Sequence, residues 1–343
     1  MRLGVLTGGG DCPGLNAAIR AVVRKAEVSF ADEIIGFYDG WRGVIEDRTL
    51  RLDVERCRGL LPRGGTVLGT SRTNPFKVED GVNKVFATLE RHGVDAVLAI
   101  GGEGTLGASR RLADLGVPVI GIPKTIDNDV NATDSTVGFS TAVQVATEAI
   151  DRLHTTAESH DRVMVCEVMG RHVGWIALYA GLAAGAAVIL LPEDPFDIGA
   201  VSEHLRRRHS KGRYASIVVV AEGAKPKEGT IELPPPEIDQ YDHERLGGIA
   251  AVVAREIEAT SGFECRVTIL GHVLRGGTPS AFDRMLATRF GIAAVEAAHD
   301  RDFGKMVALH GQEIDRVDLK DAVGDLKHVP SDLFDGLTRI FLD

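Results

Sequence analysis

The sequence is poor in cysteine and has no excess of positive charge, and each shortage excludes a class of protein. Its four cysteines, Cys12, Cys57, Cys166 and Cys265, are widely spaced and include no Cys-x-x-Cys pair. We therefore expect no disulfide scaffold, and we place the protein in a reducing cytoplasm. The formal net charge of −10 would repel a polyanion, so neither a nucleic acid nor an acidic membrane surface is an expected partner.

Long apolar runs are also scarce. The apolar start, Met1–Thr7, is too short for the hydrophobic region of a signal peptide. Val173–Pro192 has no formal charge and the length of a membrane span. It is rich in Ala and Gly, however, and divides at Gly185 into a helix-like piece, Trp175–Ala184, and a strand-like piece, Val188–Leu191. The composition favours a buried helix followed by a buried strand, and no membrane partner.

What the sequence does contain is a repeated alternation of short apolar runs with segments of helical periodicity. The 343 residues and the 44% apolar content are enough for two domains. The alternation predicts an α/β protein with parallel strands, joined by a helix that starts near Val137 and runs to Leu153. The expected strands are Met1–Thr7, Glu33–Tyr38, Ala96–Ile100, Val117–Ile122, Val163–Val168, Val188–Leu191, Ile217–Ala221 and Val267–Leu270.

Glycine-rich loops follow three of the expected strands in the first half. Gly8–Gly14 matches neither the Walker A pattern nor Gly-x-Gly-x-x-Gly, but glycines before a helix let a phosphate approach the backbone. Gly64–Arg72 and Gly101–Leu106 are similar. One such loop is compatible with a simple tight turn. Three at the carboxyl ends of parallel strands predict a ligand with several phosphoryl groups.

Three side chains near these loops each have two interpretations. Arg72 can hold a phosphate. Glu103 can hold Mg²⁺ directly or through water, or it can simply complement the dipole of the helix that follows. Trp41 can stack on a base or cap the hydrophobic core.

The segment Pro123–Asp129 combines one cation, one hydroxyl and two carboxylates directly after an apolar strand. We expect a loop at the edge of a cleft, where one carboxylate takes a proton from an attacking hydroxyl and Lys124 balances charge on an anionic partner. The alternative is an Asx-rich turn that caps the next helix.

The second half places arginines and a histidine at strand ends, namely in Met169–Arg171, at Arg266 and in His272–Gly277, with Glu222 after another strand. These side chains suit a second phosphate, and surface ion pairs are the alternative for any one of them. Ala224–Arg245 has many charges, three consecutive prolines and no periodicity, which predicts an exposed excursion.

Taken together, these motifs resemble 6-phosphofructokinase over nearly the whole chain. The resemblance is strongest to the actinobacterial branch, which mixes ATP- and pyrophosphate-using enzymes. It implies two three-layer α/β domains with mainly parallel sheets: 1–137 with about 274–322 for the nucleotide, and 138–273 with about 323–343 for the sugar phosphate. The motifs are Gly8–Asn16, Gly101–Thr105, Pro123–Asp129, Met169–Arg171 and Gly271–Gly277.

The resemblance also implies a glycolytic kinase that transfers a phosphoryl group from MgATP to the 1-hydroxyl of fructose 6-phosphate. Asp127 would be the general base, Thr125 and Asp129 would place the hydroxyl and the metal, and Lys124 and Arg171 would stabilise the transferring group. The nucleotide would contact Gly10, Trp41, Arg72, Thr73, Gly102, Glu103, Gly104 and Thr105, with Glu103 at Mg²⁺. The sugar phosphate would contact Thr125, Ile126, Asp127, Met169, Gly170, Arg171, Glu222, His272, Val273, Leu274 and Arg275, and, from a neighbouring subunit of a homotetramer or homodimer, Arg162 and Arg266.

Two positions bear on the phosphoryl donor. Pyrophosphate enzymes of the family resemble one another in having Asp where this chain has Gly104, together with Lys at the position of Lys124. Because glycine leaves room for an α-phosphate that a carboxylate would crowd and repel, we expect ATP, with pyrophosphate as the alternative. A sugar-phosphate sensor without activity is a further alternative, but it would be expected to have lost the base or Glu103. NAD and lipid kinases share the Gly101–Thr105 pattern but lack the arginine motifs of the second half.

The effector pocket of the bacterial relatives is only partly matched. Arg20, Arg24, Lys211 and Arg213 fit its pattern. His154 stands where an arginine is expected and Ala187 where a glutamate would help to hold a metal, so a response to the same effectors is not predicted.

Overall fold

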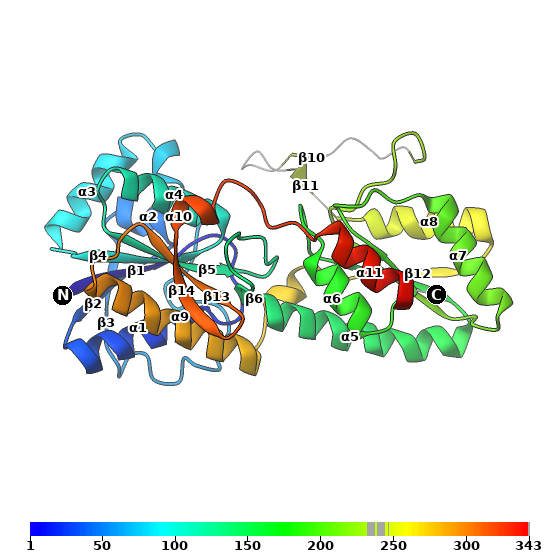
Figure 1. The fold of residues 1–343 in the computed structure, drawn as a ribbon, viewed down its shortest axis with the longest axis horizontal. Helices are drawn as coiled ribbons and strands as arrows, with labels where there is room; N and C mark the ends of the chain where they lie inside the picture. The colour runs from blue at the N-terminus through cyan, green and yellow to red at the C-terminus, as the bar shows by residue number, and fades with distance from the viewer. Residues whose placement is uncertain (232–236, 239–243, 246, 342–343) are drawn as a thin grey trace. The chain divides into compact units, whose positions relative to one another are not determined.

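The computed structural model describes residues 1–231, 237–238, 244–245 and 247–341. The chain forms two compact units, which are drawn in Figure 1. The first comprises Met1–Thr141 and Arg275–Lys327, and the second comprises Ala142–Leu274 and His328–Asp343. The excursion expected at Ala224–Arg245 lies partly outside the described residues.

The first unit is built on a mainly parallel sheet. Among the described residues its strands are β1 (Arg2–Thr7), β2 (Glu33–Phe37), β3 (Thr49–Leu52), β4 (Ala96–Gly101), β5 (Val119–Thr125), β6 (Val137–Gly138), β13 (Lys305–His310) and β14 (Glu313–Asp318). The order is β14-β13-β5-β4-β1-β2-β3, with β6 beside β5. Only the outermost pairs, β2 with β3 and β13 with β14, are antiparallel. The carboxyl ends of β1, β4 and β5 therefore meet at one edge.

Helices cover both faces of this sheet (Figure 1). On one face lie α1 (Leu15–Phe30) and α9 (Ala281–His299), and on the other lie α2 (Trp41–Ile45), α3 (Gly81–Arg91), α4 (Glu103–Asp114) and α10 (Leu319–Ala322). Apolar residues of the central strands pack against the second group to form the core, for example Leu6, Val97 and Val119 against Val85 and Leu112. A short 3₁₀ helix, Pro75–Lys77, precedes α3.

The second unit has a parallel four-stranded sheet within the described residues, in the order β12-β7-β9-β8. Its strands are β7 (Val163–Val168), β8 (Val188–Leu190), β9 (Ser216–Ala221) and β12 (Cys265–Ile269). Its helices are α5 (Phe139–His160), which begins in the first unit, α6 (Trp175–Ala183), α7 (Ile198–Ser210), α8 (Ile249–Ser261) and α11 (Ser331–Phe341). Two short strands, β10 (Glu237–Ile238) and β11 (Glu244–Arg245), pair with each other. The 3₁₀ helix η2 (Gly271–Arg275) leads back to the first unit.

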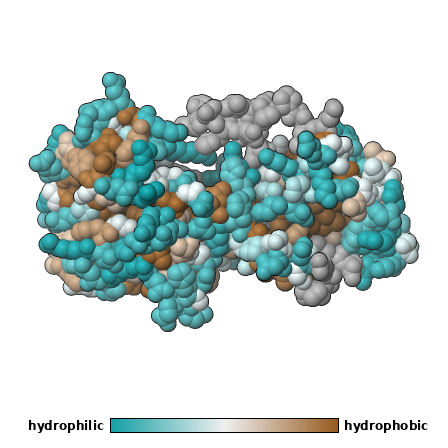
Figure 2. All heavy atoms as spheres, turned by 45° about the horizontal axis from the view of Figure 1, so that its top comes forward, coloured by the Kyte–Doolittle hydropathy of each residue, from teal (hydrophilic) through white to brown (hydrophobic). Residues whose placement is uncertain are grey.

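The α/β class with mainly parallel sheets is confirmed, and so is the buried helix followed by a strand in Val173–Pro192, which forms α6 and β8. No helix within the described residues is long and apolar enough to cross a membrane. Figure 2 shows one face of the molecule, on which hydrophilic residues predominate and hydrophobic ones form small groups.

Two expectations about strands are wrong. Pro123, Lys124 and Thr125 are not loop residues, because backbone pairing with β4 and with β6 keeps them extended as the end of β5. Arg266 lies inside β12 rather than before it. Strands β3, β13 and β14 were not expected at all. In β14, Glu-Ile-Asp-Arg-Val-Asp has four charged residues in six, so it lacks the apolar run that marks the other strands.

Candidate active site

The three glycine loops of the first unit lie against one another at the carboxyl ends of β1 and β4. The Gly8 N–H donates to Ile100 O (2.9 Å) and the Gly9 N–H to Ser71 O (2.9 Å). In return, the Thr70 hydroxyl donates to Gly9 O (2.6 Å). Segments that are far apart in the sequence therefore form a single backbone surface.

At three glycines of this surface other side chains approach the backbone closely. A Cβ on Gly8 would lie 2.5 Å from Oγ1 of Thr105, and a Cβ on Gly101 would lie 2.4 Å from Cβ of Thr105. A Cβ on Gly10 would lie 1.8 Å from Nη1 of Arg275. The Thr105 side chain thus packs against two loops, at Gly8 and at Gly101, and the Arg275 guanidinium packs against the first of them at Gly10.

Lys124 holds the first glycine loop in place. Its Nζ donates to Gly8 O (2.9 Å) and Gly10 O (2.5 Å), and the residue is 2% exposed. An ammonium group has three donors, so two backbone carbonyls leave one for a further partner. Burial lowers the pKa of Lys124. The structure places the ammonium at the base of the loop, where its charge lies next to the surface expected to bind phosphate.

The two carboxylates of the acidic segment lie in a tight turn after β5. The Asp127 N–H donates to Thr125 Oγ1 (3.1 Å). Asn128 has a left-handed backbone (φ 55°), and its Oδ1 accepts from the Thr136 N–H (3.1 Å). The Thr136 hydroxyl in turn donates to Thr125 O (2.7 Å). The Asn128 side chain therefore stabilises the turn, and Asp127 and Asp129 are its neighbours in the chain.

The alternative interpretation of this segment, a cap on the next helix, is wrong. The start of α5 is capped by Asp283 of α9, whose carboxylate accepts from the Gly138 N–H (2.9 Å) and the Thr141 N–H (2.7 Å). Asp283 is fully buried, and burial raises its pKa while these hydrogen bonds lower it. Because Asp283 does the capping, Asp127 and Asp129 are not needed for it.

Trp41 requires a correction. It is 2% exposed and packs in the core with Phe37 and Val44, and its Nε1–H donates to Thr105 O (3.4 Å). The indole caps the core and leaves no face for a base. By contrast, Arg72 is exposed beside Thr73, which is half-buried.

Glu103 is exposed and begins helix α4. Among the described residues no group of three or more His, Cys, Asp or Glu side chains could hold a metal. Magnesium bound to a nucleotide takes most of its ligands from water and phosphate and needs only one or two carboxylates, so a single exposed carboxylate at the glycine surface fits that use. Beside it, a Cβ on Gly104 would meet nothing within 4 Å, which leaves open space above the start of α4, next to Gly102.

In the second unit, the ends of β7 and β9 bring together several predicted residues. The Glu222 N–H donates to Val168 O (2.9 Å) and the Gly223 N–H to Gly170 O (3.0 Å). Gly170 has φ 146°, a conformation that other residues rarely adopt. Met169, Gly170, Arg171 and Glu222 therefore form one group at this sheet edge.

Arg162 and Arg266 form a separate group, since both bind Glu264. The Arg162 Nε lies 2.8 Å from Glu264 Oε2, and Arg266 contacts the other oxygen. The hydrogen bond from Arg162 is the main cause that lowers the pKa of Glu264. Within one chain these arginines form the surface ion pairs that were the alternative interpretation.

The remaining predicted site residues differ in how exposed their side chains are. His272 is exposed and Val273 is 65% exposed. Leu274 is fully buried and Ile126 is 3% exposed, so only their backbone groups can reach a ligand.

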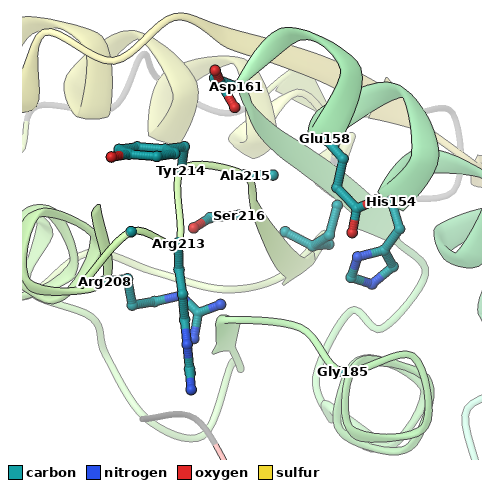
Figure 3. A pocket seen from close by; sticks show the side chains of 11 residues that line it. His154, Glu158, Asp161, Gly185, Arg208, Arg213, Tyr214, Ala215 and Ser216 are labelled. Carbon is teal, nitrogen blue, oxygen red and sulfur yellow. The ribbon is translucent and has the colours of Figure 1, made fainter. Parts of the chain in front are cut away.

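A pocket of about 420 Å³ in the second unit contains two of the positions compared with the effector pattern, His154 and Arg213 (Figure 3). His154 lies 2.6 Å from Ala184 O through Nε2. Arg208 and Arg213 lie near each other, and burial followed by the charge of Arg213 lowers the pKa of Arg208. Ala187 is buried and does not line the pocket.

Comparison with known proteins fits this arrangement. Residues 2–298 match the family described as Phosphofructokinase. The chain belongs to the phosphofructokinase family. A pyrophosphate–fructose 6-phosphate 1-phosphotransferase of Streptomyces coelicolor is 59% identical over 99% of this chain and 100% of its own length. An ATP-dependent 6-phosphofructokinase 3 of the same organism is 57% identical over 96% of this chain and 97% of its own.

Solved structures agree on the fold of this phosphofructokinase. The structure of phosphofructokinase from Saccharomyces cerevisiae has a TM-score of 0.81 and 33% identity, covering 94% of this chain. This chain spans 45% of the yeast chain. A pyrophosphate-dependent phosphofructokinase from Nitrosospira multiformis has a TM-score of 0.85 at 21% identity and shows the fold.

Several residues that shape the site were not predicted. Asn128 lies within Pro123–Asp129, but the sequence pattern assigns it no role. Asp283, Thr136 and Lys327 were not singled out because they carry no local pattern, and their partners are distant in the sequence.

Proposed function

We propose that this phosphofructokinase transfers a phosphoryl group from MgATP to the 1-hydroxyl of fructose 6-phosphate. The observation that carries the proposal is the sheet edge in the first unit at which β1, β4 and β5 end. There β1 presents a glycine loop whose carbonyls bind the Lys124 ammonium of β5, and the turn after β5 presents Asp127 and Asp129. A phosphate-binding surface and a carboxylate base at one sheet edge are what transfer to an alcohol needs.

The proposed mechanism assigns one task to each group. Asp127 accepts the proton of the 1-hydroxyl as that oxygen attacks the γ-phosphorus, and the bond to the leaving ADP oxygen breaks. Lys124, Arg171 and backbone N–H groups of the glycine loop balance the charge on the transferring group. Mg²⁺, when bound near Glu103 and Asp129, would neutralise the phosphate oxygens. Removal of one preorganised donor or base from such a site typically lowers the rate about 10²-fold or more.

The sugar-phosphate end of the substrate is proposed to bind Met169, Gly170, Arg171, Glu222, His272 and Arg275. Arg162 and Arg266 would complete the site from a neighbouring subunit, so we propose a homo-oligomer, either a tetramer or a dimer. Support comes from the edge strand β12, where Val267 and Ile269 are 38% and 53% exposed next to Arg266. The four cysteines are all buried and reduced, in keeping with work in the cytoplasm.

ATP is proposed as the donor because of Gly104. Names of the similar proteins divide between ATP and pyrophosphate. A Cβ on Gly104 would have no neighbour within 4 Å, so an α-phosphate has room to bind beside this residue. An Asp at position 104 would place a negative charge against the negatively charged phosphate.

Parallel assays of the purified protein with fructose 6-phosphate and Mg²⁺ test the proposal, with either ATP or pyrophosphate as donor. Formation of fructose 1,6-bisphosphate with ATP is expected. Product with pyrophosphate only would overturn the donor assignment. No product with either donor would overturn the function.

A further inference from the structure

The turn that carries Asp127 and Asp129 is held by a segment from near the end of the chain. The Lys327 N–H donates to Asp129 O (3.0 Å), and Val130 forms an antiparallel bridge with Leu326. The Asn131 amide donates to Asp325 O (2.6 Å). Residues 325–327 therefore run alongside residues 129–131 like an added strand.

The side chain of Lys327 continues this contact around the turn. Its Nζ donates to Thr133 O (2.9 Å) and to Asp134 O (2.7 Å). The main chain and side chain of one residue thus bind carbonyl groups at both ends of the stretch from Asp129 to Asp134. The stretch is short, so these three bonds fix its ends relative to each other.

This stretch needs external support. Ala132 has a left-handed backbone (φ 57°), a conformation that is unfavourable for residues other than glycine and asparagine. On the side away from Lys327 the stretch is bound by β13 and the residue after it, since the Asp134 N–H donates to Leu309 O (2.8 Å) and the Gly311 N–H to Asp134 Oδ2 (2.7 Å). Lys327 binds Asp129, the end of the stretch that is nearest to Asp127 in the chain.

We propose that Lys327 is a positioning residue for phosphoryl transfer, whose charged side chain fixes the turn that carries the base Asp127. The inference rests on the proposed function, because it takes Asp127 as the base. Lys327 does not need to touch the substrate. It acts by keeping the Asp127 carboxylate at the distance from the hydroxyl that proton transfer requires, and a displacement of about 1 Å in such a geometry can lower the rate about 10²-fold.

Lys327→Arg is the conservative variant for this role. Burial lowers the pKa of the Lys327 ammonium from 10.5 to about 8, and the Asp134 and Asp129 carboxylates oppose that shift. An arginine at this position keeps a positive charge and several N–H donors.

The segment is also held by bonds that do not involve the Lys327 side chain. The Lys327 N–H still donates to Asp129 O, Leu326 still pairs with Val130, and the Asn131 amide still donates to Asp325 O. A substitution of the Lys327 side chain therefore leaves the segment paired with the turn, and Lys327→Met is expected to fold.

The test compares the full-length wild type with Lys327→Met, Lys327→Arg and the control Lys320→Met, whose side chain is 65% exposed. We expect Lys327→Met to lower kcat by about 10- to 10²-fold with KM for ATP unchanged, and Lys320→Met to match the wild type. Lys327→Arg keeps the charge and the donors, so its kcat should lie closer to that of the wild type than to that of Lys327→Met. An unchanged kcat in Lys327→Met, or a loss in Lys327→Arg as large as that in Lys327→Met, overturns the proposal.

Hydrogen exchange of the backbone amides of residues 128–136 tests the positioning role without a measurement of catalysis. We expect these amides to exchange about tenfold faster in Lys327→Met while core amides keep their rates. If the wild type has no kinase activity, the proposed function fails and exchange still decides the positioning role. If Lys327→Met does not fold, kcat and hydrogen exchange of Lys327→Gln, which keeps a donor but not the charge, decide it.

Discussion

Gly10→Ala tests the arrangement of the glycine loop and Arg275 in a way that can be worked from the structure. The new methyl carbon would lie 1.8 Å from Nη1 of Arg275 and 2.9 Å from its Cζ. Nonbonded heavy atoms need about 3.5 Å, so the guanidinium has to move by roughly 1.7 Å from its place against the loop. The obstacle is the end of a flexible side chain, so the fold should adapt at little cost in stability.

The expected result is a loss of activity without a loss of fold. If Arg275 binds the reacting phosphates or the sugar phosphate, a shift of this size should lower kcat/KM about 10²-fold. Gly336→Ala in α11 is the matched control, because its methyl group would also meet nothing within 4 Å and Gly336 has no proposed contact with a substrate. Steady-state kinetics gives kcat/KM of both variants, and thermal unfolding gives their stability. A Gly10→Ala enzyme with wild-type kcat/KM would refute the role of Arg275 at this loop.

Three further predictions follow from the same structure. Gly104→Asp should raise KM for ATP, because the carboxylate fills the open space beside Gly102 with like charge; unchanged ATP kinetics would contradict the donor argument. Asp283→Ala should destabilise the fold by about 3 kcal/mol or more in urea unfolding, since the buried N–H groups of Gly138 and Thr141 lose their charged acceptor. Burial lowers the pKa of Lys327 from 10.5 in the unfolded chain to about 8 in the folded protein. Between these two pH values the unfolded state binds more protons than the folded state, so the contribution of Lys327 to the free energy of unfolding should rise with pH. In Lys327→Met that rise should be absent, and a rise equal to that of the wild type would show that it comes from other groups.

The fold was predictable to the extent that its strands are apolar runs. β7 was predicted over its full length because all six of its residues are buried. The hairpin of β13 and β14 could not be predicted in the same way, because β14 is half-exposed and its charged residues alternate with Ile314 and Val317. Pairing with β13, rather than its own composition, makes it a strand.

The candidate site was predictable where it depends on short loops. Glycines at strand ends and the carboxylates after β5 are local features of the sequence. The sequence left two interpretations of Trp41 open, and the nucleotide contact implied by the resemblance was wrong. Packing, which no local pattern records, decides that the indole faces the core. Lys327 and Asp283 lie 194 and 142 residues from Thr133 and Thr141, the partners they hold. Contacts of that separation exist only in the folded chain.

The most direct test of the account is the turnover of Asp127→Asn. The account predicts a protein that folds, assembles and binds fructose 6-phosphate and ATP like the wild type, with kcat lower by at least about 10²-fold because the amide cannot accept the proton of the attacking hydroxyl. Near-normal kcat for this variant would contradict the assignment of Asp127 as the base and with it the proposed mechanism.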